Sequence, residues 1–488
     1  MRHMPLPQRH ARAFPRSISM TLVLASSVML YTGSPALALQ VQDAQYDCTI
    51  IASSLEFPDA FSRIPPTVNS QGRVAFFANL ATGSGIYTGI GDTDASGDII
   101  IDPVVTAAHV GAFLTNLGTQ PPVIVDDGRV YFKGTKTPGG GGGAADGIFR
   151  KYWYTDEAID PEWRLETTNW DAGAPFIRIN DAVMANTRDD VAFIGRDIVE
   201  SQDGLFWEAG SSPNPLVYFQ NPGDDVGTVR DFDIHPSDQP WYGYISNRYN
   251  SSDTELNVLQ MGEPYRVLNG AVASMDGVSI AGSALPVASW AESVYDGGAT
   301  TWRIHQANAI AMSVYVDNGV DTTGFSGAPS QTSINGYAEV AFSGGWEDEM
   351  HVADGDVLNR VVCNNAQSVF GTSYFAKTIH SKRAINNDGQ IAFITEASFY
   401  MFPGQSVPAW YVVLADPVTR ARPTSCISLL DDSPCDDGVP ETVSLCAGEI
   451  CTPVPEPKAL RQGVVALLAL ALVGGSRKNR PRFPHHRY

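Results

Sequence analysis

The side chains that could carry out nucleophilic or acid–base chemistry are few and scattered along the chain. Nucleophilic catalysis needs a base within reach of a serine or cysteine, and the sequence has no G-x-S-x-G nucleophile elbow. It also has no H-x-H or H-E-x-x-H pair that would indicate zinc. Carboxylates are too numerous for one pair to stand out as the acid and nucleophile of a glycosidase. The body of the chain has these histidines: His109, His235, His305, His351 and His380. The sequence therefore predicts a non-enzymatic protein.

One acidic loop has the residue types of a calcium site. Oxygen-bearing side chains alternate along it and a turn glycine lies among them, as in calcium-binding loops. The ligands would be Asp92, Asp94, Ser96 and Asp98. The twelfth position of the loop is Pro103 rather than an acid, so a hairpin insertion between two strands is the competing interpretation. Calcium is the one cofactor that the sequence suggests.

A short pattern, Asn-x-x-Gly-x-x-Ala-Phe, recurs along the body and predicts the elements that would position any site. Asn and Gly form a tight turn because both tolerate positive φ, and the alternating apolar residues that follow indicate a half-buried strand. Two copies keep every key position: Asn69, Gly72, Ala75 and Phe76, then Asn386, Gly389, Ala392 and Phe393. Two weaker copies contain Asn186, Ala192 and Phe193, then Asn335, Ala341 and Phe342. Partial copies begin at Val125 and His235.

The spacing of these copies predicts the fold. Neighbouring copies start about 50 residues apart, and the longer gap after His235 predicts a degenerate unit around Ser274–Gly277. Each unit is expected to be a small antiparallel meander that cannot bury its own face and must stack on its neighbours. About seven such units over residues 45–420 predict an all-β fold, a β-propeller with four-stranded blades. A β-sandwich or a β-solenoid is the alternative.

The N-terminal end has the order of a secretory signal peptide. Four arginines precede an apolar run from Ile18 to Tyr31, and the small residues Ala36 and Ala38 follow. Cleavage is expected after Ala38, so residues 1–38 are predicted to be the signal. The chain is therefore predicted to be exported.

The C-terminal end, residues 454–482, has three parts in the order of a sorting signal. The first is the motif Val454, Pro455, Glu456 and Pro457. The second is an apolar run, Gly463 to Gly475, of marginal length for spanning about 30 Å of hydrocarbon. The third is a basic cluster that would stay cytoplasmic by the positive-inside rule: Arg477, Lys478, Arg480 and Arg482. The sequence predicts a transient insertion into the inner membrane, with an ordinary C-terminal membrane anchor as the alternative.

These C-terminal residues resemble the PEP-CTERM sorting signal of Gram-negative bacteria that produce exopolysaccharide. The resemblance implies that an exosortase, a membrane cysteine protease, cuts at the Pro-Glu-Pro motif and releases or transfers the body to the surface or the matrix. The recurring pattern is similar to that of the choice-of-anchor tandem-repeat proteins, defined by an NxxGxxAF repeat and sorted by such signals. This second resemblance implies architecture and surface location rather than chemistry.

The six cysteines are an even number in a chain predicted to be exported, which favours disulfides. Cys48 and Cys363 are predicted to pair and to tie the start of the body to a late repeat. The other four lie in residues 421–453 and predict two bridges in a small cap or stalk: Cys426, Cys435, Cys446 and Cys451. A zinc site is the alternative, although no C-x-x-C pair occurs and no histidine lies in the cluster.

The charge of the chain limits its partners, and three function classes stay open. The net charge is −21, and a protein this acidic is repelled by nucleic acid and by anionic membranes. The favoured class is a structural or interaction protein of the cell surface or exopolysaccharide matrix. The second is a glycan-binding module, in which Trp153, Tyr154, Trp207 and Trp241 would stack on sugar rings unless they pack in the core. The third is a secreted propeller hydrolase or lyase with a site in its central channel.

Overall fold

The computed structural model describes residues 41–453 with gaps. Those gaps are 55–63, 81–82, 107, 111–112, 137–144, 157–159, 167–175, 199–200, 209–212, 221–225, 237–240, 252–253, 261–262, 271–272, 282–285, 297–298, 309–311, 318–330, 345–348, 355–356, 365–375, 403–404, 419–433, 436–443 and 448–449. The chain divides into two compact units, Met1–Leu37 and Ala38–Tyr488, and all the described residues belong to the second. The signal peptide, the sorting motif and the basic cluster lie outside the described residues and stay predictions. Among the described residues no helix is long and apolar enough to cross a membrane.

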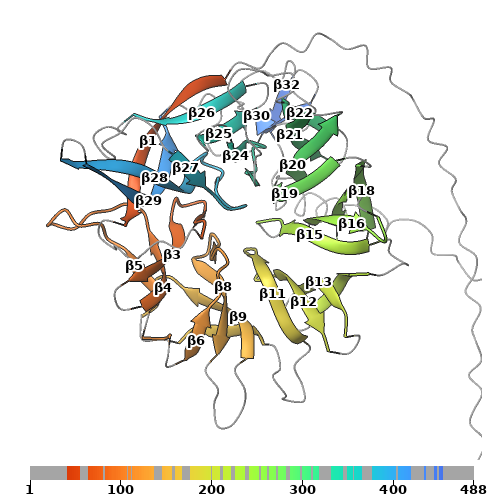
Figure 1. Ribbon diagram of the computed structural model, residues 1–488, viewed down its shortest axis with the longest axis horizontal. Coiled ribbons are helices and arrows are strands. Elements are labelled where there is room, and N and C mark those ends of the chain that lie inside the picture. The colour runs from red at the N-terminus through yellow and green to blue at the C-terminus, as the bar shows by residue number, and fades with distance from the viewer. Residues whose placement is uncertain are drawn as a thin grey trace, which may run out of the picture. The chain divides into compact units, whose positions relative to one another are not determined.

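In the described residues the second unit is a β-propeller of seven blades, six with four strands and one, blade 2, with five (Figure 1), which confirms the predicted fold class. Blade 1 contains β2 (Thr67–Val68), β3 (Val74–Leu80), β4 (Gly83–Gly89) and β5 (Asp102–Val105). In blade 2, both β6 (Leu114–Leu117) and β7 (Val123–Ile124) pair with β8 (Arg129–Lys136), followed by β9 (Ala145–Tyr152) and β10 (Glu162–Glu166). Blade 3 contains β11 (Phe176–Ala185), β12 (Val191–Asp197), β13 (Asp203–Glu208) and β14 (Pro213–Tyr218).

The remaining blades follow in chain order. Blade 4 contains β15 (Val226–Ile234), β16 (Trp241–Arg248), β17 (Thr254–Gln260) and β18 (Glu263–Gly270). Blade 5 contains β19 (Ala273–Ala281), β20 (Val287–Asp296), β21 (Ala299–Asn308) and β22 (Met312–Asp317). Blade 6 contains β23 (Thr332–Ile334), β24 (Val340–Gly344), β25 (Glu349–Asp354) and β26 (Val357–Cys363). Blade 7 contains β27 (Ala376–Ile379), β28 (Ile391–Phe402), β29 (Gln405–Pro417) and, from the start of the chain, β1 (Val41–Ser53).

The recurring pattern forms the turn between the first and second strands of a blade. In blade 1 the Asn69 side-chain oxygen accepts hydrogen bonds from the backbone N–H groups of Gln71 and Arg73, at 3.1 and 2.9 Å. Gly72 has a φ of 73°, which a glycine adopts without strain. The turns at Asn186, Asn335 and Asn386 are built in the same way. The Ala and Phe that follow are buried in the second strand: Ala75, Phe76, Ala192, Phe193, Ala341, Phe342, Ala392 and Phe393.

The degenerate unit predicted around Ser274–Gly277 exists and is blade 5, which begins with β19, although these residues do not form its first turn. In this blade β19 ends at Ala281 and β20 begins at Val287. Ser274–Gly277 lies inside β19 instead, where the register with β20 shifts between Asp276 and Ser279. Gly277 has a φ of 67°, and a Cβ there would lie 2.7 Å from the Cα of Gln331 in the next blade. The glycine therefore marks a bulge against a neighbouring backbone rather than a turn.

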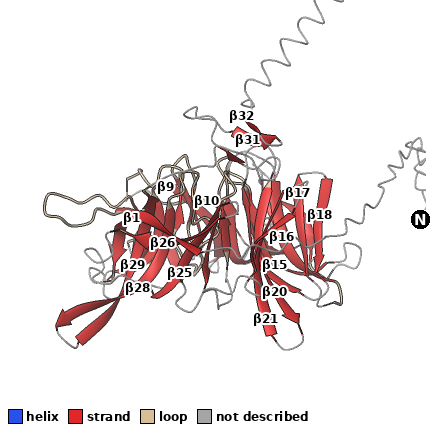
Figure 2. Ribbon diagram, turned by 90° about the horizontal axis from the view of Figure 1, so that it is seen from above, coloured by secondary structure: helices blue, strands red, loops and turns tan. Residues whose placement is uncertain are grey.

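The ring is closed by its first strand. β1 pairs antiparallel with β29, from Tyr46 opposite Pro417 to Ser53 opposite Tyr411. Its first half pairs in parallel with β26 of blade 6, which joins blades 6 and 7 into one eight-stranded sheet. A disulfide between Cys48 and Cys363, with Cα atoms 5.4 Å apart, fastens this junction and confirms the predicted pairing. Beyond the part paired with β1, the ends of β28 and β29 project outward (Figure 2).

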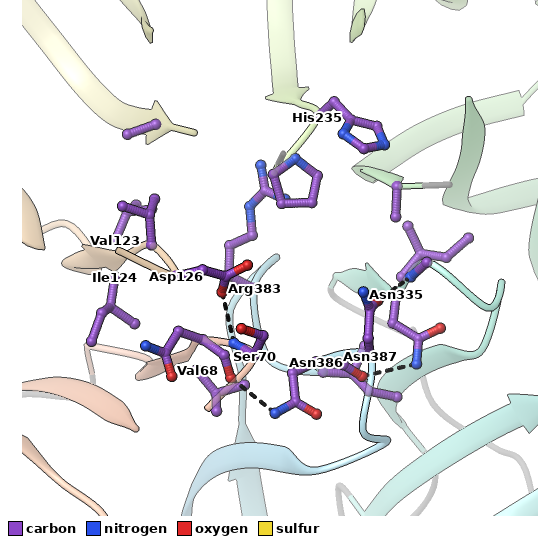
Figure 3. A pocket seen from close by; sticks show the side chains of 18 of the residues that line it. Val68, Ser70, Val123, Ile124, Asp126, His235, Asn335, Arg383, Asn386 and Asn387 are labelled. Atoms are coloured by element: carbon purple, nitrogen blue, oxygen red, sulfur yellow. Dashed lines mark hydrogen bonds between the residues drawn. The ribbon is translucent and has the colours of Figure 1, made fainter. Parts of the chain in front are cut away.

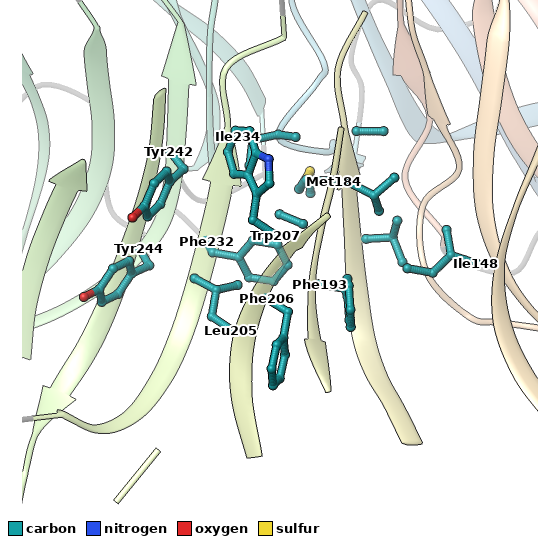
Figure 4. Packing of buried hydrophobic residues seen from close by; sticks show 14 of the residues in the cluster. Ile148, Met184, Phe193, Leu205, Phe206, Trp207, Phe232, Ile234, Tyr242 and Tyr244 are labelled. Carbon is teal, nitrogen blue, oxygen red and sulfur yellow. The ribbon is translucent and has the colours of Figure 1, made fainter. Parts of the chain in front are cut away.

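Apolar side chains between adjacent blades form the core. The cluster drawn in Figure 4 spans blades 2 to 4, and its aromatic members pack both within a blade and across a blade interface. Between blades 3 and 4, Trp207 of β13 contacts Tyr242 of β16 with ring centroids 5.5 Å apart, and within blade 3 Phe193 stacks on Phe206 at 5.7 Å. Aromatic pairs of this kind add to the hydrophobic gain of burial, so they hold the blades in a fixed stack.

The cysteine-rich segment forms a separate small sheet. Its strands are β30 (Pro434–Cys435), β31 (Ser444–Ala447) and β32 (Ile450–Pro453). Cys446 lies opposite Cys451 in the register of β31 and β32. Cys426 lies outside the described residues, and the pairing of these four cysteines stays a prediction.

Candidate functional site

The centre of the propeller is occupied by residues 380–386, which join β27 to β28 and which we call the hub segment. Its backbone carbonyls accept hydrogen bonds from three other blades. Arg383 O accepts from Val68 N–H of blade 1 at 2.9 Å. Lys382 O accepts from Ser333 Oγ of blade 6 at 2.9 Å and from Ser279 Oγ of blade 5 at 3.2 Å. The hub segment therefore ties blade 7 to blades 1 and 5, which do not precede or follow it in sequence, as well as to blade 6.

Two basic side chains of the hub segment cross the channel to blade 4. Lys382 Nζ pairs with Asp231 and donates to Phe232 O at 2.6 Å. Arg383 Nη2 donates to Asp233 Oδ1 at 2.9 Å. Burial raises the pKa of both carboxyls, Asp231 and Asp233, and the two cations oppose that rise. The two positive charges are thus neutralised inside the fold.

Asp233 is the point at which three blades meet. Its side chain is fully buried, and its second oxygen accepts from the backbone N–H of Ile280 in blade 5 at 2.9 Å. The first oxygen accepts from Ile234 N–H at 2.8 Å as well as from Arg383. Because both oxygens of this buried carboxylate accept hydrogen bonds, Asp233 holds blades 4, 5 and 7 in one arrangement.

His380, at the start of the hub segment, is buried and held by backbone groups on both sides. Its Nε2 accepts from Ser343 N–H at 3.0 Å, and its Nδ1 lies 3.0 Å from Ser381 O. The neutral tautomer with the proton on Nδ1 satisfies both bonds. Burial lowers the pKa of His380 to about 4, so the imidazole is neutral in the folded protein at pH 7.

We expect His380 to make the protein less stable in acid. Between pH 6.5 and pH 4 the unfolded chain protonates this histidine and the folded chain does not, so the free energy of unfolding falls as the pH falls. The loss is on the order of 3 kcal/mol and levels off below pH 4. Denaturant unfolding at both pH values, compared with His380→Gln, isolates this contribution because glutamine accepts the Ser343 bond without titrating. Equal pH dependence in the two proteins would contradict the prediction.

The turns of the repeat surround one mouth of the channel and are bonded to one another. Asn335 Nδ2 donates to Asn386 O, and Asn386 Nδ2 donates to Asn69 O, both at 2.9 Å. Ser70 N–H donates to Asp126 Oδ1 at 2.8 Å, which carries the chain of bonds into blade 2. Since each bond joins neighbouring blades, these turns form a linked rim around the mouth.

Inside this rim is a cavity of about 230 Å³, which we call the mouth cavity (Figure 3). Its polar lining comes from the rim and the hub segment, and includes Asn69, Ser70, Asp126, His235, Asn335, Arg383, Asn386 and Asn387. Its apolar lining includes Val68, Val123 and Ile124. A second cavity of about 150 Å³ shares Arg383 with it and is lined by Asp231 and Lys382. The mouth cavity is the candidate ligand site.

The predicted calcium loop forms a hairpin. Asp94 Oδ1 accepts from the backbone N–H groups of Ser96 and Asp98 at 2.7 and 3.1 Å, and Gly97 takes a φ of 89°. The strand-like pairing of Thr93 with Ile99 closes the hairpin. Among the described residues, this loop included, no group of three His, Cys, Asp or Glu side chains could hold a metal ion.

Two of the four aromatics suggested for sugar stacking are in the core, so that part of the suggestion is wrong. Trp207 and Trp241 are both buried, and Trp207 belongs to the core cluster that spans blades 2 to 4. Tyr154 is 59% exposed, and Trp153 is half-buried beneath the Arg73 guanidinium, whose carbon lies 3.4 Å from the ring centroid. The sequence reading missed Lys382 and Arg383, although two adjacent basic residues just before the repeat at Asn386 stand out in so acidic a chain.

Comparison with known proteins gives likenesses of fold. No family model matches the sequence, and no curated protein matches it. Among solved structures, prolyl oligopeptidase B from Galerina marginata is similar at 11% identity and a TM-score of 0.46, over 81% of this chain and 52% of that one. The β-propeller domain of the trilobed protease from Pyrococcus furiosus is similar at 10% identity and a TM-score of 0.37, over 70% and 92%. Oligopeptidase B from Leishmania major is similar at 10% identity and a TM-score of 0.40, over 76% of this chain and 47% of that one. The chain spans about half the length of the two oligopeptidases.

Proposed function

We propose that this protein is exported and acts at the cell surface or in the exopolysaccharide matrix as a rigid interaction scaffold. Before that, an exosortase-type protease processes its C-terminus while the apolar segment lies in the inner membrane. The order of parts at residues 1–38 and 454–482 supports the location, and the seven linked blades support a scaffold role.

The observation that carries the scaffold role is that the ionisable side chains of the hub segment are engaged in contacts between blades. Lys382 and Arg383 are engaged with Asp231 and Asp233, and both ring nitrogens of His380 face backbone groups. General acid–base catalysis needs a group that can exchange a proton near the working pH. These groups bind blades together instead, which favours an interaction role over the hydrolase or lyase alternative.

The test is the intact mass and both terminal residues of the protein recovered from its native cells, fraction by fraction. We expect a surface or matrix form that begins near Leu39 and ends near Pro455–Pro457. A variant with alanine at Pro455, Glu456 and Pro457 should accumulate uncut in the inner-membrane fraction. If the unaltered protein keeps Arg477 and stays in that fraction, the proposal is wrong and the protein is a membrane-tethered domain.

A further inference from the structure

The rim turn of blade 1 differs from the equivalent turns of other blades in the hydrogen-bond partner of its asparagine side chain. In three turns the Asn Nδ2 group has an acceptor four residues later. Asn186 donates to Asp190 at 3.2 Å, Asn386 to Gln390 Oε1 at 2.8 Å, and Asn335 to Glu339. In blade 1 the equivalent residue is Arg73, which is itself a donor and pairs with Asp102 at 2.5 Å. Asn69 Nδ2 is buried and has no acceptor among the described residues.

A second buried donor belongs to the same cavity. Arg383 Nη2 is engaged with Asp233, but Arg383 Nε has no acceptor within the described part of the chain. Asn69 and Arg383 are 3% and 8% exposed, and both line the mouth cavity. Buried polar groups in folded proteins are nearly always hydrogen-bonded, so a buried donor without an acceptor calls for an explanation, such as a water, an ion or a ligand group that completes it. Two residues that line the mouth cavity, Asn69 and Arg383, therefore each carry a buried donor without an acceptor among the described residues.

The charges around the cavity favour a neutral ligand. The positive charge of Arg383 is balanced by Asp233, and the rim carries the exposed carboxylate of Asp126. The net charge of −21 also opposes the approach of an anion. A sugar hydroxyl accepts and donates at once, so it can meet Asn69 and Arg383 while facing Asp126. The apolar wall at Val68 and Val123 suits the carbon face of a sugar ring.

We propose that the mouth cavity binds one neutral sugar unit of a polysaccharide, with Asn69 Nδ2 and Arg383 Nε donating to its oxygens. This inference rests on the proposed function and deepens it by naming the ligand class of the scaffold. The proposal also explains why Arg73 stands where the other turns have an acceptor side chain. An acceptor at that position would accept the hydrogen bond of Asn69 Nδ2 and leave none for a ligand.

The variant that tests the site is Asn69→Asp. It keeps the oxygen that accepts from Gln71 and Arg73 N–H, so the turn is retained, and it removes the Nδ2 donor. The matched control is Asn250→Asp, which makes the same charge change in an exposed turn residue with a φ of 56° that does not line the cavity. Both variants should show the circular dichroism spectrum of the unaltered protein.

The probes are dextran and galactomannan, both neutral, and alginate, which is acidic, titrated into protein recovered from native cells. We expect a neutral polysaccharide to bind, Asn69→Asp to raise its Kd about tenfold, and Asn250→Asp to leave it unchanged. Hydrogen exchange with and without that polysaccharide should show protection at residues 69–72 and 335–338, a readout that needs no variant. Equal affinity in Asn69→Asp, a preference for alginate, protection confined to other blades, or no binding would each overturn the site. If the terminal masses still place the protein at the surface, the proposed function stands.

Discussion

Replacing Asp233 with alanine is expected to destabilise the propeller by about 3 to 5 kcal/mol. The change leaves Arg383 buried without its carboxylate, and breaking a buried ion pair by removing one partner costs this much. It also removes the acceptor of Ile280 N–H, which links blade 5 to blade 4. The measurement is the free energy of unfolding in urea at pH 7, with intrinsic fluorescence as the signal.

A surface ion pair provides the matched control for Asp233→Ala. Arg178 donates to Asp203 at 2.9 Å, but its side chain is 49% exposed. Water screens such a pair, so Arg178→Ala should change the unfolding free energy by about 0.5 kcal/mol or less. The double variant Asp233→Ala with Arg383→Met should recover part of the loss because no unpaired charge then remains. If Asp233→Ala is as mild as Arg178→Ala, the pair across the channel does not hold the blades.

Removing the Cys48–Cys363 disulfide is expected to cost about 5 kcal/mol. The bridge closes a loop across a sequence separation of 315, and the loss of chain entropy in the unfolded state grows with loop length. The variant Cys48→Ala with Cys363→Ala should therefore unfold at much lower urea than the oxidised protein.

Reduction of the unaltered protein gives an independent measure of the same bond. Dithiothreitol should lower the urea midpoint of the unaltered protein to about that of the double alanine variant. It should shift the urea midpoint of the variant itself far less. If reductant and the double variant both leave the transition where it was, the closure of the ring depends on the strand pairing of β1 alone.

The parts of the fold that could be predicted from sequence are those encoded locally. The turn at Asn69 is formed by contacts within a few residues of the chain, because its side chain accepts hydrogen bonds from the residues two and four positions later. The pattern therefore predicts this turn wherever its residues are present. Blade 5 lacks the full pattern, and Gly277 marks a bulge in its first strand rather than a turn, a difference that the sequence does not reveal because a bulge glycine and a turn glycine look alike.

The candidate site could not be predicted in the same way because its contacts are long-range. Lys382 and Asp231 are 151 residues apart, and only the closed ring brings them together. The donor of Asn69 is left without an acceptor by Arg73, a difference that becomes visible only when the four turns are compared as structures. The mouth cavity is likewise formed by turns from several blades.

The pairing of β1 also determines the order in which the chain can fold. The partners of β1 are β26 and β29, which end at Cys363 and Pro417. Among the described strands β1 is therefore synthesised first, but it can pair only after these two later strands have been synthesised. Contacts of such long sequence separation slow folding, since the ends must meet before the contact is gained. Until then blades 1 to 6 can assemble around an open seam with β1 unpaired. The ring therefore cannot close until Pro417, the last residue of β29, is available to pair with β1.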